Sequence, residues 1–298
     1  MKKLNEVVVD AMEFFESERV PPLNLDVPKK CLVVASGNAV LTGKIIFKDH
    51  QAVFSDEGRY RDLLNLYEEI EAVVVISASG EKHAPIIIKD LQNSYPSKKP
   101  YLLTCSENST AATLLRKNYP QHVFVTRSIP EPITYNTSTY LGMILGKTGE
   151  DPGKIKKHIV QVIKKKLDKV QWKAYRAFYI LIEPEFDATR EMFITKFDEL
   201  FGGRLTGRCY TREQTYHAKT VVPWEKELFI SIGYDNKTFG DKKNRLNLPL
   251  FEGANFAAVI ATGYYTVGTI QTKFPQWFVK NADEYRKIQK KWFEGMRR

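Results

Sequence analysis

Short runs of mostly apolar residues alternate with amphipathic stretches through the first half of the chain. The runs cover residues 31–35, 51–54, 73–76, 101–105 and 122–125. Their length suits strands, and their unbroken apolar character indicates a parallel sheet with both faces covered. The stretches between them place apolar side chains at helical intervals, over residues 39–48, 61–67, 84–93 and 111–115. Alternation at this spacing predicts a doubly wound α/β layer.

The second half follows the same plan less regularly. Residues 177–182 begin a second α/β layer, a helix is predicted over 189–201, and residues 227–232 and 257–260 are further strand or core candidates. A leading helix over residues 1–20 ends at the prolines that follow. Residues 146–153 combine glycines, a proline and charges between helical stretches. They predict a boundary between a domain of residues 1–150 and a domain of residues 151–298.

Positive charge gathers in the second half. The formal net charge is +10, but residues 1–150 hold 17 Lys and Arg against 18 Asp and Glu, whereas residues 151–298 hold 28 against 17. Much of the excess lies in residues 154–173, where lysines are interleaved with Ile, Val and Leu. This pattern predicts an amphipathic helix with a solvated basic face. Nucleic-acid binding through residues 154–173 is the alternative, and no zinc-finger or RNA-recognition motif supports it.

Composition excludes several classes of protein. The hydrophobic fraction of 43% is ordinary for a globular chain, and no apolar run approaches the ~20 residues that cross a membrane. The first residues soon meet acids instead of forming a signal-peptide core, so we expect a cytoplasmic protein. Cys31, Cys105 and Cys209 lack the spacing of zinc ligands or of a disulfide framework, and we expect them to be small buried side chains.

Small hydroxyl residues and glycines follow two of the predicted strands. Ser36-Gly37-Asn38 follows residues 31–35, and Ser77-Ala78-Ser79-Gly80-Glu81-Lys82 follows residues 73–76. Parallel strands end at one edge of a sheet, so both loops should lie there. Backbone N–H groups at a helix start, with hydroxyls beside them, favour an anion. The tight turn of an ordinary βα unit is the alternative for either loop alone.

Read together, these loops resemble the sugar isomerase (SIS) family, in particular the double-SIS isomerase portion of glucosamine-6-phosphate synthase. Residues 77–81 are similar to the family's S-x-S-G-E phosphate loop, residues 35–38 to its first glycine-containing loop, and residues 131–140, which are dense in hydroxyls, to its E-x-x-V-x-S-T-K-x-[FY] segment. The resemblance covers most of residues 30–285. It implies two SIS-type doubly wound parallel-sheet subdomains of three-layer α-β-α architecture, with no metal or organic cofactor. It also implies a sugar phosphate held by Ser36, Gly37, Asn38, Ser77, Ala78, Ser79, Lys82, Asn136, Thr137 and Lys196.

The second half resembles the part of the family that carries acid–base chemistry. Residues 196–200 look like its K-x-K-E-[IL] helix, whose glutamate moves a proton between adjacent carbons, and this implies that role for Glu199. Residues 210–217 are similar to the segment ending in a histidine that assists ring opening from the neighbouring subunit. The resemblance therefore implies His217 and a homodimer with a shared active site. Residues 274–280 look like the C-terminal proline segment, which implies Lys280.

The chain also departs from the family pattern. Ala39 and Lys82 stand where the family has hydroxyl or amide side chains, and Thr137-Ser138 stands where it has a T-K pair. Lys82 can compensate by pairing with phosphate directly, because a flexible ammonium is a common phosphate partner. Glu183-Pro184-Glu185 replaces the glycine loop that opens the family's second half. We therefore expect no second phosphate site there.

These residues fit aldose–ketose exchange, in which a carboxylate with a raised pKa removes and returns a carbon-bound proton while His or Lys protonates oxygen. The sequence predicts a sugar-phosphate isomerase, or a related deaminase or deglycase acting on an amino-sugar phosphate. A non-catalytic phosphosugar-binding regulator is the alternative. Taken singly, Glu199, His217 and Lys280 also fit a solvated helix residue, a satisfied histidine and a basic tail.

Overall fold

The computed structural model describes residues 1–295, so the last three residues of the predicted second domain lie outside the described part. The chain forms two compact units that exchange segments. The first, here called the five-stranded unit, comprises Phe14–Ile129 and Ser138–Asp151. The second, the four-stranded unit, comprises Met1–Glu13, Pro130–Thr137 and Pro152–Arg298. The units are not separated by a single boundary at residue 150, because the chain passes between them more than once. The last passage, between Asp151 and Pro152, lies beside the predicted boundary.

The five-stranded unit is built on a fully parallel sheet. The strand order is β2-β1-β3-β4-β5. In this doubly wound order the chain first adds β2 on one side of β1 and then adds β3, β4 and β5 on the other side. All five strands predicted from the apolar runs are present. Their bounds are β1 (Lys30–Val34), β2 (Gln51–Ser55), β3 (Ala72–Ile76), β4 (Lys99–Thr104) and β5 (Val123–Val125).

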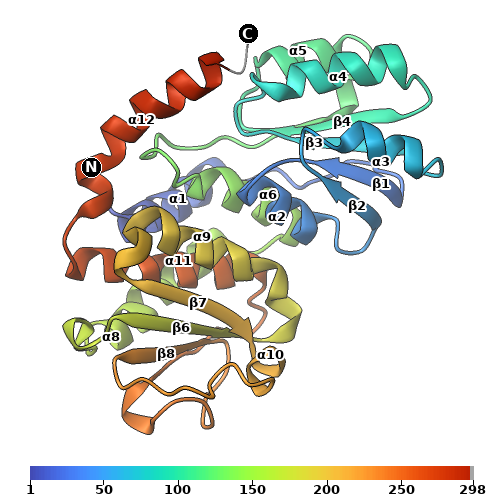
Figure 1. Ribbon diagram of the computed structural model, residues 1–298. Helices are drawn as coiled ribbons and strands as arrows, with labels where there is room; N and C mark the ends of the chain where they lie inside the picture. The colour runs from blue at the N-terminus through green and yellow to red at the C-terminus, as the bar shows by residue number, and fades with distance from the viewer. Residues whose placement is uncertain (296–298) are drawn as a thin grey trace. The chain divides into compact units, whose positions relative to one another are not determined.

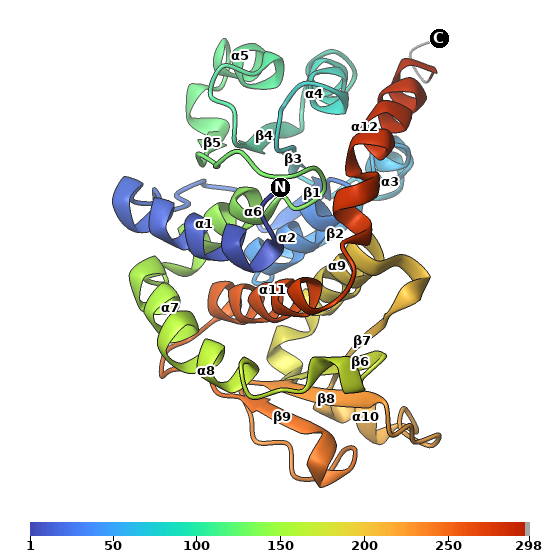
Figure 2. The same cartoon turned by 90° about the vertical axis from the view of Figure 1, so that its left-hand side faces the viewer.

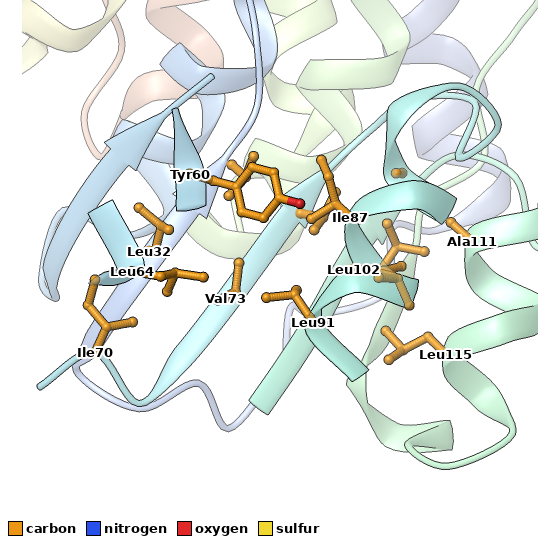
Figure 3. Close-up of a cluster of buried hydrophobic side chains, with 14 of the residues drawn as sticks. Leu32, Tyr60, Leu64, Ile70, Val73, Ile87, Leu91, Leu102, Ala111 and Leu115 are labelled. Carbon is orange, nitrogen blue, oxygen red and sulfur yellow. The ribbon is translucent and has the colours of Figure 1, made fainter. Parts of the chain in front are cut away.

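Helices cover both faces of this sheet. One face packs against α3, α4 and α5 through a buried apolar cluster in which Leu32, Val73 and Leu102 of the strands meet Leu91 and Leu115 of the helices (Figure 3). On the other face, α2 approaches so closely that a Cβ on Gly43 would lie 2.8 Å from Val33. The helices are α2 (Asn38–Ile46), α3 (Tyr60–Leu66), α4 (His83–Ser94), α5 (Thr110–Arg116) and α6 (Thr137–Thr148), while α1 (Leu4–Glu18) and α6 each have residues in both units.

The four-stranded unit repeats the plan with one strand fewer. Its order, β7-β6-β8-β9, corresponds to β2-β1-β3-β4 of the other sheet, and all neighbours are again parallel. Helices α9 and α11 pack on one face (Figures 1 and 2). The other face carries an aromatic cluster with Tyr179 and Phe229 at its centre. The elements are β6 (Ala177–Ile182), β7 (Thr206–Thr211), β8 (Glu227–Ile232), β9 (Arg245–Leu248), α7 (Pro152–His158), α8 (Lys164–Leu167), α9 (Arg190–Phe201), α10 (Arg212–Tyr216), α11 (Phe256–Lys273) and α12 (Trp277–Gly295).

The predicted α/β fold class is confirmed, with corrections in the second half. Residues 257–260, one of the strand or core candidates, lie inside α11, which is buried along residues 256–271. A long uncharged run does not distinguish a buried helix from a buried strand by periodicity. Strands β7 and β9 were missed, because Thr206–Thr211 and Arg245–Leu248 mix polar side chains with apolar ones. The helix predicted over residues 189–201 is α9.

The basic stretch is helical with a buried seam. Ile155, Ile159, Ile163 and Leu167 are buried, four residues apart each time, while the lysines at 157, 164–166 and 169 are exposed. In a regular α-helix such spacing drifts by about 40° per step. A π-helical turn at Ile159–Ile163, between α7 and α8, opposes that drift by widening the turn. The predicted amphipathic helix with a solvated basic face is therefore confirmed.

Candidate active site

A lysine–glutamate pair on α9 contains a fully buried ammonium group. Lys196 and Glu199 are three residues apart, so they project from the same side of the helix. The Lys196 Nζ donates to the Glu199 carboxylate at 2.7 Å and to the Thr134 carbonyl at 2.8 Å. The Lys196 side chain has no exposed surface, whereas that of Glu199 is 23% exposed. Glu199 is therefore the member of the pair that can reach a ligand.

Burial perturbs both groups. It raises the pKa of Glu199 above the ordinary 4.5, and the Lys196 ammonium opposes this shift without cancelling it. Burial also lowers the pKa of Lys196 below 10.5, against the pull of Glu199. A carboxyl group whose pKa is raised toward neutrality can both take and return a proton, as a general acid–base requires.

The segment facing Lys196 has an unusual backbone. Thr134 and Asn136 have positive φ angles of 72° and 46°, which is uncommon for non-glycine residues and costly for a β-branched one. The segment is held by Lys196 on the Thr134 carbonyl and by the Glu131 carboxylate, which accepts from the Thr137 N–H at 2.6 Å. Backbone strain that the surroundings enforce in this way is typical of functional sites.

Tyr135 anchors the middle of this segment. Its side chain is fully buried, and its hydroxyl exchanges hydrogen bonds with the Gln271 amide of α11 and lies 3.3 Å from the Lys2 carbonyl. The ring stacks on Phe278 with centroids 5.3 Å apart. Burial raises the pKa of Tyr135 to about 12, so the hydroxyl stays protonated. The strained segment is thus fixed to α11 and to the start of α12.

A cavity of about 480 Å³ opens beside Glu199. Its walls come from the Thr134 segment, the end of α9, the turn that follows and the first half of α12. The lining residues are Thr134, Asp198, Glu199, Leu200, Phe201, Gly202, Arg204, Trp277, Phe278, Asn281, Ala282 and Tyr285. This is the size of a pocket for a small organic ligand.

Two of the three predicted catalytic residues do not line this cavity. Lys280 is exposed on α12, and its position falls about 60° around the helix from Trp277, about 100° from Asn281 and about 140° from Tyr285, which do line it. His217 is exposed at the end of α10 and is absent from the lining as well. Within the described chain, only Glu199 of the three reaches the cavity of its own unit.

The two predicted anion loops lie at the carboxyl edge of the five-stranded sheet. Residues 36–38 follow β1 and residues 77–82 follow β3, and these two strands are hydrogen-bonded neighbours. Gly37 has a φ of 56° where the chain turns into α2. Asn38 is 8% exposed, and its Oδ1 has no hydrogen-bond partner among residues 1–295. The Ser36 hydroxyl donates to Glu57 at 2.9 Å, so a ligand would have to displace that bond.

The loop after β3 has a fixed shape. Gly80 has a φ of 66°, and a Cβ there would overlap the Ser109 side chain. The Glu81 carboxylate accepts from the N–H and hydroxyl of Thr110 at 2.9 and 2.6 Å, which holds the loop to the start of α5 and lowers the pKa of Glu81. The loop is therefore held in this shape by its contacts with the start of α5.

The same loop keeps donors for an anion. Ser77 and Ser79 accept hydrogen bonds from the N–H groups of Gly80 and Glu81, which leaves their hydroxyl hydrogens to donate elsewhere. Helices α2 and α4, which follow the two loops, begin without a side-chain cap, whereas Ser109 caps α5. Lys82 is exposed at the start of α4. This arrangement suits an anion at the α2 and α4 starts.

The other predicted ligand contacts separate into two groups. Asn136 is exposed on the strained segment, whereas Thr137 is buried with an Oγ1 that finds no partner in the described part of the chain. Sequence reasoning missed Thr134, Arg204 and Trp277, since neither a positive φ at threonine nor an aromatic wall has a local sequence signal. It also missed a cavity of about 670 Å³ in the five-stranded unit, lined by the end of α1 and by the loops after β4 and β5.

Other features limit the classes of site. Among residues 1–295, no cluster of His, Cys, Asp or Glu has the makings of a metal site. No helix of the described chain is both long and apolar enough to span a membrane. Cys31 and Cys209 are buried as expected, while Cys105 is half-buried, and all three are free thiols.

Comparison with known proteins shows the fold. No family profile and no curated protein sequence matches the chain. Solved structures do match over nearly the whole chain. The glucosamine-6-phosphate deaminase of Thermotoga maritima matches with a TM-score of 0.64 and 15% identity, over 92% of this chain and 96% of that one. The tagatose-6-phosphate ketose/aldose isomerase of Escherichia coli matches at 0.58 and 10%, over 91% and 87%.

The expected resemblance is also found among these structures. The C-terminal domain of the glucosamine-fructose-6-phosphate aminotransferase of Francisella tularensis matches with a TM-score of 0.55 and 11% identity, over 89% of this chain and 92% of that one. The resemblance to the SIS family is thus confirmed at the level of the fold. Identities of 10–15% carry no information about substrate by themselves.

Proposed function

We propose that the protein is a sugar-phosphate isomerase in which Glu199 is the acid–base group. The observation that carries the proposal is a largely buried carboxylate, with a raised pKa and a lysine partner, at the wall of a ligand-sized cavity. The fold is shared with proteins named as a phosphosugar isomerase and a phosphosugar deaminase, and this supports the proposed chemistry.

Glu199 would act on a carbon next to a carbonyl group. Its carboxylate takes the proton from that carbon, the C–H electron pair forms the C=C bond of an enediol, and the former carbonyl oxygen gains a proton. The protonated Glu199 then returns its proton to the former carbonyl carbon, while the hydroxyl on the carbon that was first deprotonated loses its proton and becomes the new carbonyl group. One oxygen gains a proton and the other loses one, so the aldose and ketose interconvert without net gain or loss of atoms. A raised pKa makes the Glu199 carboxylate a stronger base for removing the proton, and its acid form can still return the proton.

Lys196 would have a positioning role instead of the predicted substrate contact. Its side chain has no exposed surface, so it cannot touch a ligand in the cavity. Its two hydrogen bonds join the Glu199 carboxylate to the strained Thr134 carbonyl. We infer that Lys196 holds the base at a fixed distance from the segment that forms the opposite wall.

We propose that the loops of the five-stranded unit bind a phosphate group. The supporting observations are the hydroxyl hydrogens of Ser77 and Ser79 that are left to donate, and the backbone N–H groups at the uncapped starts of α2 and α4. Lys82 adds a positive charge at the start of α4. Three kinds of donor together favour a dianion.

A homodimer would give His217 its role. The segment that carries it also exposes Tyr216, Val221, Val222 and Trp224, between 48% and 82%, and an apolar patch of this kind is typical of an interface. If His217 acts on the site of a second copy, then mixing inactive Glu199→Gln and His217→Ala proteins restores about a quarter of the wild-type activity, because half of the random dimers carry one intact site. Absence of any recovery, with dimers formed, would exclude the shared site.

The second candidate is a phosphosugar-binding regulator without activity. The exposed positions of His217 and Lys280 favour it. Of the three predicted catalytic residues, Glu199 is the one that lines the cavity in the described chain. Such a protein keeps the phosphate loops and has no need of proton transfer.

One experiment separates the two candidates. Binding and turnover of fructose 6-phosphate and glucosamine 6-phosphate are measured for the wild type, Glu199→Gln and Glu191→Gln. Glu191 lies on the same helix, with its side chain 58% exposed, and serves as the matched control. The isomerase proposal expects turnover in the wild type and in Glu191→Gln, with a loss of 10²-fold or more in Glu199→Gln. Binding without turnover in all three proteins would favour the regulator.

A further inference from the structure

The buried ammonium group of Lys196 contacts an aromatic ring as well as its two hydrogen-bond acceptors. The Nζ lies over the ring of Tyr264, at 5.4 Å from the centroid. Tyr264 belongs to α11 and is 2% exposed. The face of an aromatic ring carries negative charge and attracts a cation, most strongly where water is excluded. The ring therefore helps to hold a positive charge that has no contact with water.

Close packing of α11 on α9 fixes the orientation of this ring. Phe193 lies three residues before Lys196, so the two side chains project from the same side of α9. The Phe193 ring meets the Tyr264 ring edge to face, with centroids 6.1 Å apart and an angle of 78° between the planes. A Cβ on Gly263 would lie 2.2 Å from the Phe193 ring, so the glycine permits the close approach of the helices. The position of the Tyr264 ring is thus set by helix packing.

Few groups support the charge on Lys196 against the cost of burial. Burial lowers the pKa of Lys196, and the carboxylates of Glu199 on the same helix and of Glu131 oppose this shift. Strand β7, helix α12 and the 3-10 turns at both ends of α9 also pack on this helix. Within the described chain, no group of these elements adds a charge that acts on Lys196. The Tyr264 ring supplies an attraction of a different kind, because the ring is neutral.

The charge on Lys196 determines whether Glu199 can act as a base. The ammonium group lowers the pKa of the Glu199 carboxyl group, against the effect of burial. A proton that moved from Lys196 to Glu199 would leave a neutral amine beside a neutral carboxylic acid, which cannot take a proton from carbon. Any group that stabilises the ammonium form of Lys196 therefore also preserves the carboxylate form of Glu199.

We propose that Tyr264 is a positioning residue, whose ring keeps Lys196 charged and in place and so maintains Glu199 as the base. Tyr264 does not belong to the cavity lining, so it acts through Lys196 and not on a ligand there. This assignment rests on the proposed function and adds a third group behind the buried pair.

Four variants separate the ring from the other properties of the residue. Tyr264→Leu removes the ring, whereas Tyr264→Phe keeps the ring and removes the ionisable hydroxyl. Pentafluorophenylalanine introduced at position 264 keeps the shape of the ring but reverses the charge on its face, so it tests the attraction even if the leucine variant does not fold. Tyr265→Leu is the matched control, because Tyr265 is a buried tyrosine of the same helix whose charged neighbours are Lys164 and Asp168.

NMR measures the titration of Lys196 without any turnover. Lysine is labelled with ¹³C at Cε, and the signal of Lys196 is assigned by its absence in Lys196→Met. Tyr264→Leu and the pentafluoro variant should lower the pKa of Lys196 by about one pH unit or more, the size of a desolvated cation–π contact. Tyr264→Phe and Tyr265→Leu should leave it unchanged. A pentafluoro variant in which Lys196 titrates as in the wild type would overturn the proposal.

The pH profile of kcat with fructose 6-phosphate connects the ring to the reaction. On the alkaline side, the fall of kcat should begin about one pH unit lower in Tyr264→Leu and in the pentafluoro variant than in the wild type. Tyr264→Phe and Tyr265→Leu should keep the wild-type profile. If Lys196 titrates as expected but no protein turns over the sugar phosphate, the proposed function fails and the contact with the ring stands. Turnover with the same profile in all five proteins would overturn the positioning role alone.

Discussion

Replacing Lys196 by methionine tests whether the stability of the protein depends on keeping both partners of the buried pair on α9. Methionine keeps most of the buried stem but removes the ammonium group. The Thr134 carbonyl then loses its 2.8 Å donor, and the Glu199 carboxylate loses its 2.7 Å partner while remaining mostly buried. Removing one partner of a buried pair costs about 3–5 kcal/mol. Because Glu199 is 23% exposed to water, we expect the lower end, about 3 kcal/mol.

The double variant Lys196→Met/Glu199→Gln provides the comparison. With no carboxylate left, the penalty of an uncompensated charge disappears, and we expect the double variant to lie within about 1 kcal/mol of the wild type. Urea unfolding gives the free energies of the wild type, of Lys196→Met, of Glu199→Gln and of the double variant, and the double-mutant cycle over these four proteins gives the coupling. A Lys196→Met protein as stable as the wild type, or a double variant less stable than the single one, would refute the idea that Lys196 mainly compensates Glu199.

Three further predictions concern the strained segment, the phosphate loop and the base. Tyr135→Phe removes the hydroxyl that bonds Gln271 and should lower the free energy of unfolding by about 1–3 kcal/mol, measured by urea titration. Gly80→Ala places a side chain at a left-handed φ and makes it clash with Ser109. Phosphate binding, measured by calorimetry, should be lost, and the free energy of unfolding should fall by about 1–3 kcal/mol. Since the carboxylate form of Glu199 is the base and burial raises its pKa above 4.5, a kcat profile should fall as the pH drops through this raised value. In Lys196→Met the fall should begin at a higher pH, because the ammonium group that lowers the pKa is gone.

The first sheet was predictable because its strands are short apolar runs between helical stretches. The run at residues 73–76 became β3, and its loop lies beside the loop after β1 because the two strands are neighbours. The same rule failed for β7, where Gly207 and Arg208 interrupt the apolar pattern. Gly207 is needed there because a Cβ would overlap the Phe197 ring of α9. Packing of α9 against β7 accounts for the glycine in that strand, and the pattern of apolar residues within the strand does not contain this contact.

The candidate site was predictable only where its functional residues are close to one another in the sequence. The spacing of Lys196 and Glu199 on one helix places them together, and the loop at residues 77–82 has the donors that its composition indicates. The cavity walls were not predictable. Trp277 and Arg204 come from different elements, and their contact depends on how α12 packs on α9. His217 and Lys280 are exposed and lie outside the cavity lining, and their predicted roles stay predictions.

Hydrogen exchange at carbon tests the central claim most directly. Fructose 6-phosphate is incubated in D₂O with the wild type, with Glu199→Gln and with Glu191→Gln, and NMR follows deuterium at the carbon next to the carbonyl group. The account predicts labelling by the wild type and by Glu191→Gln, and none above the enzyme-free rate with Glu199→Gln. Labelling at the wild-type rate by Glu199→Gln, or no labelling by the wild type under conditions where the sugar phosphate binds, would contradict it.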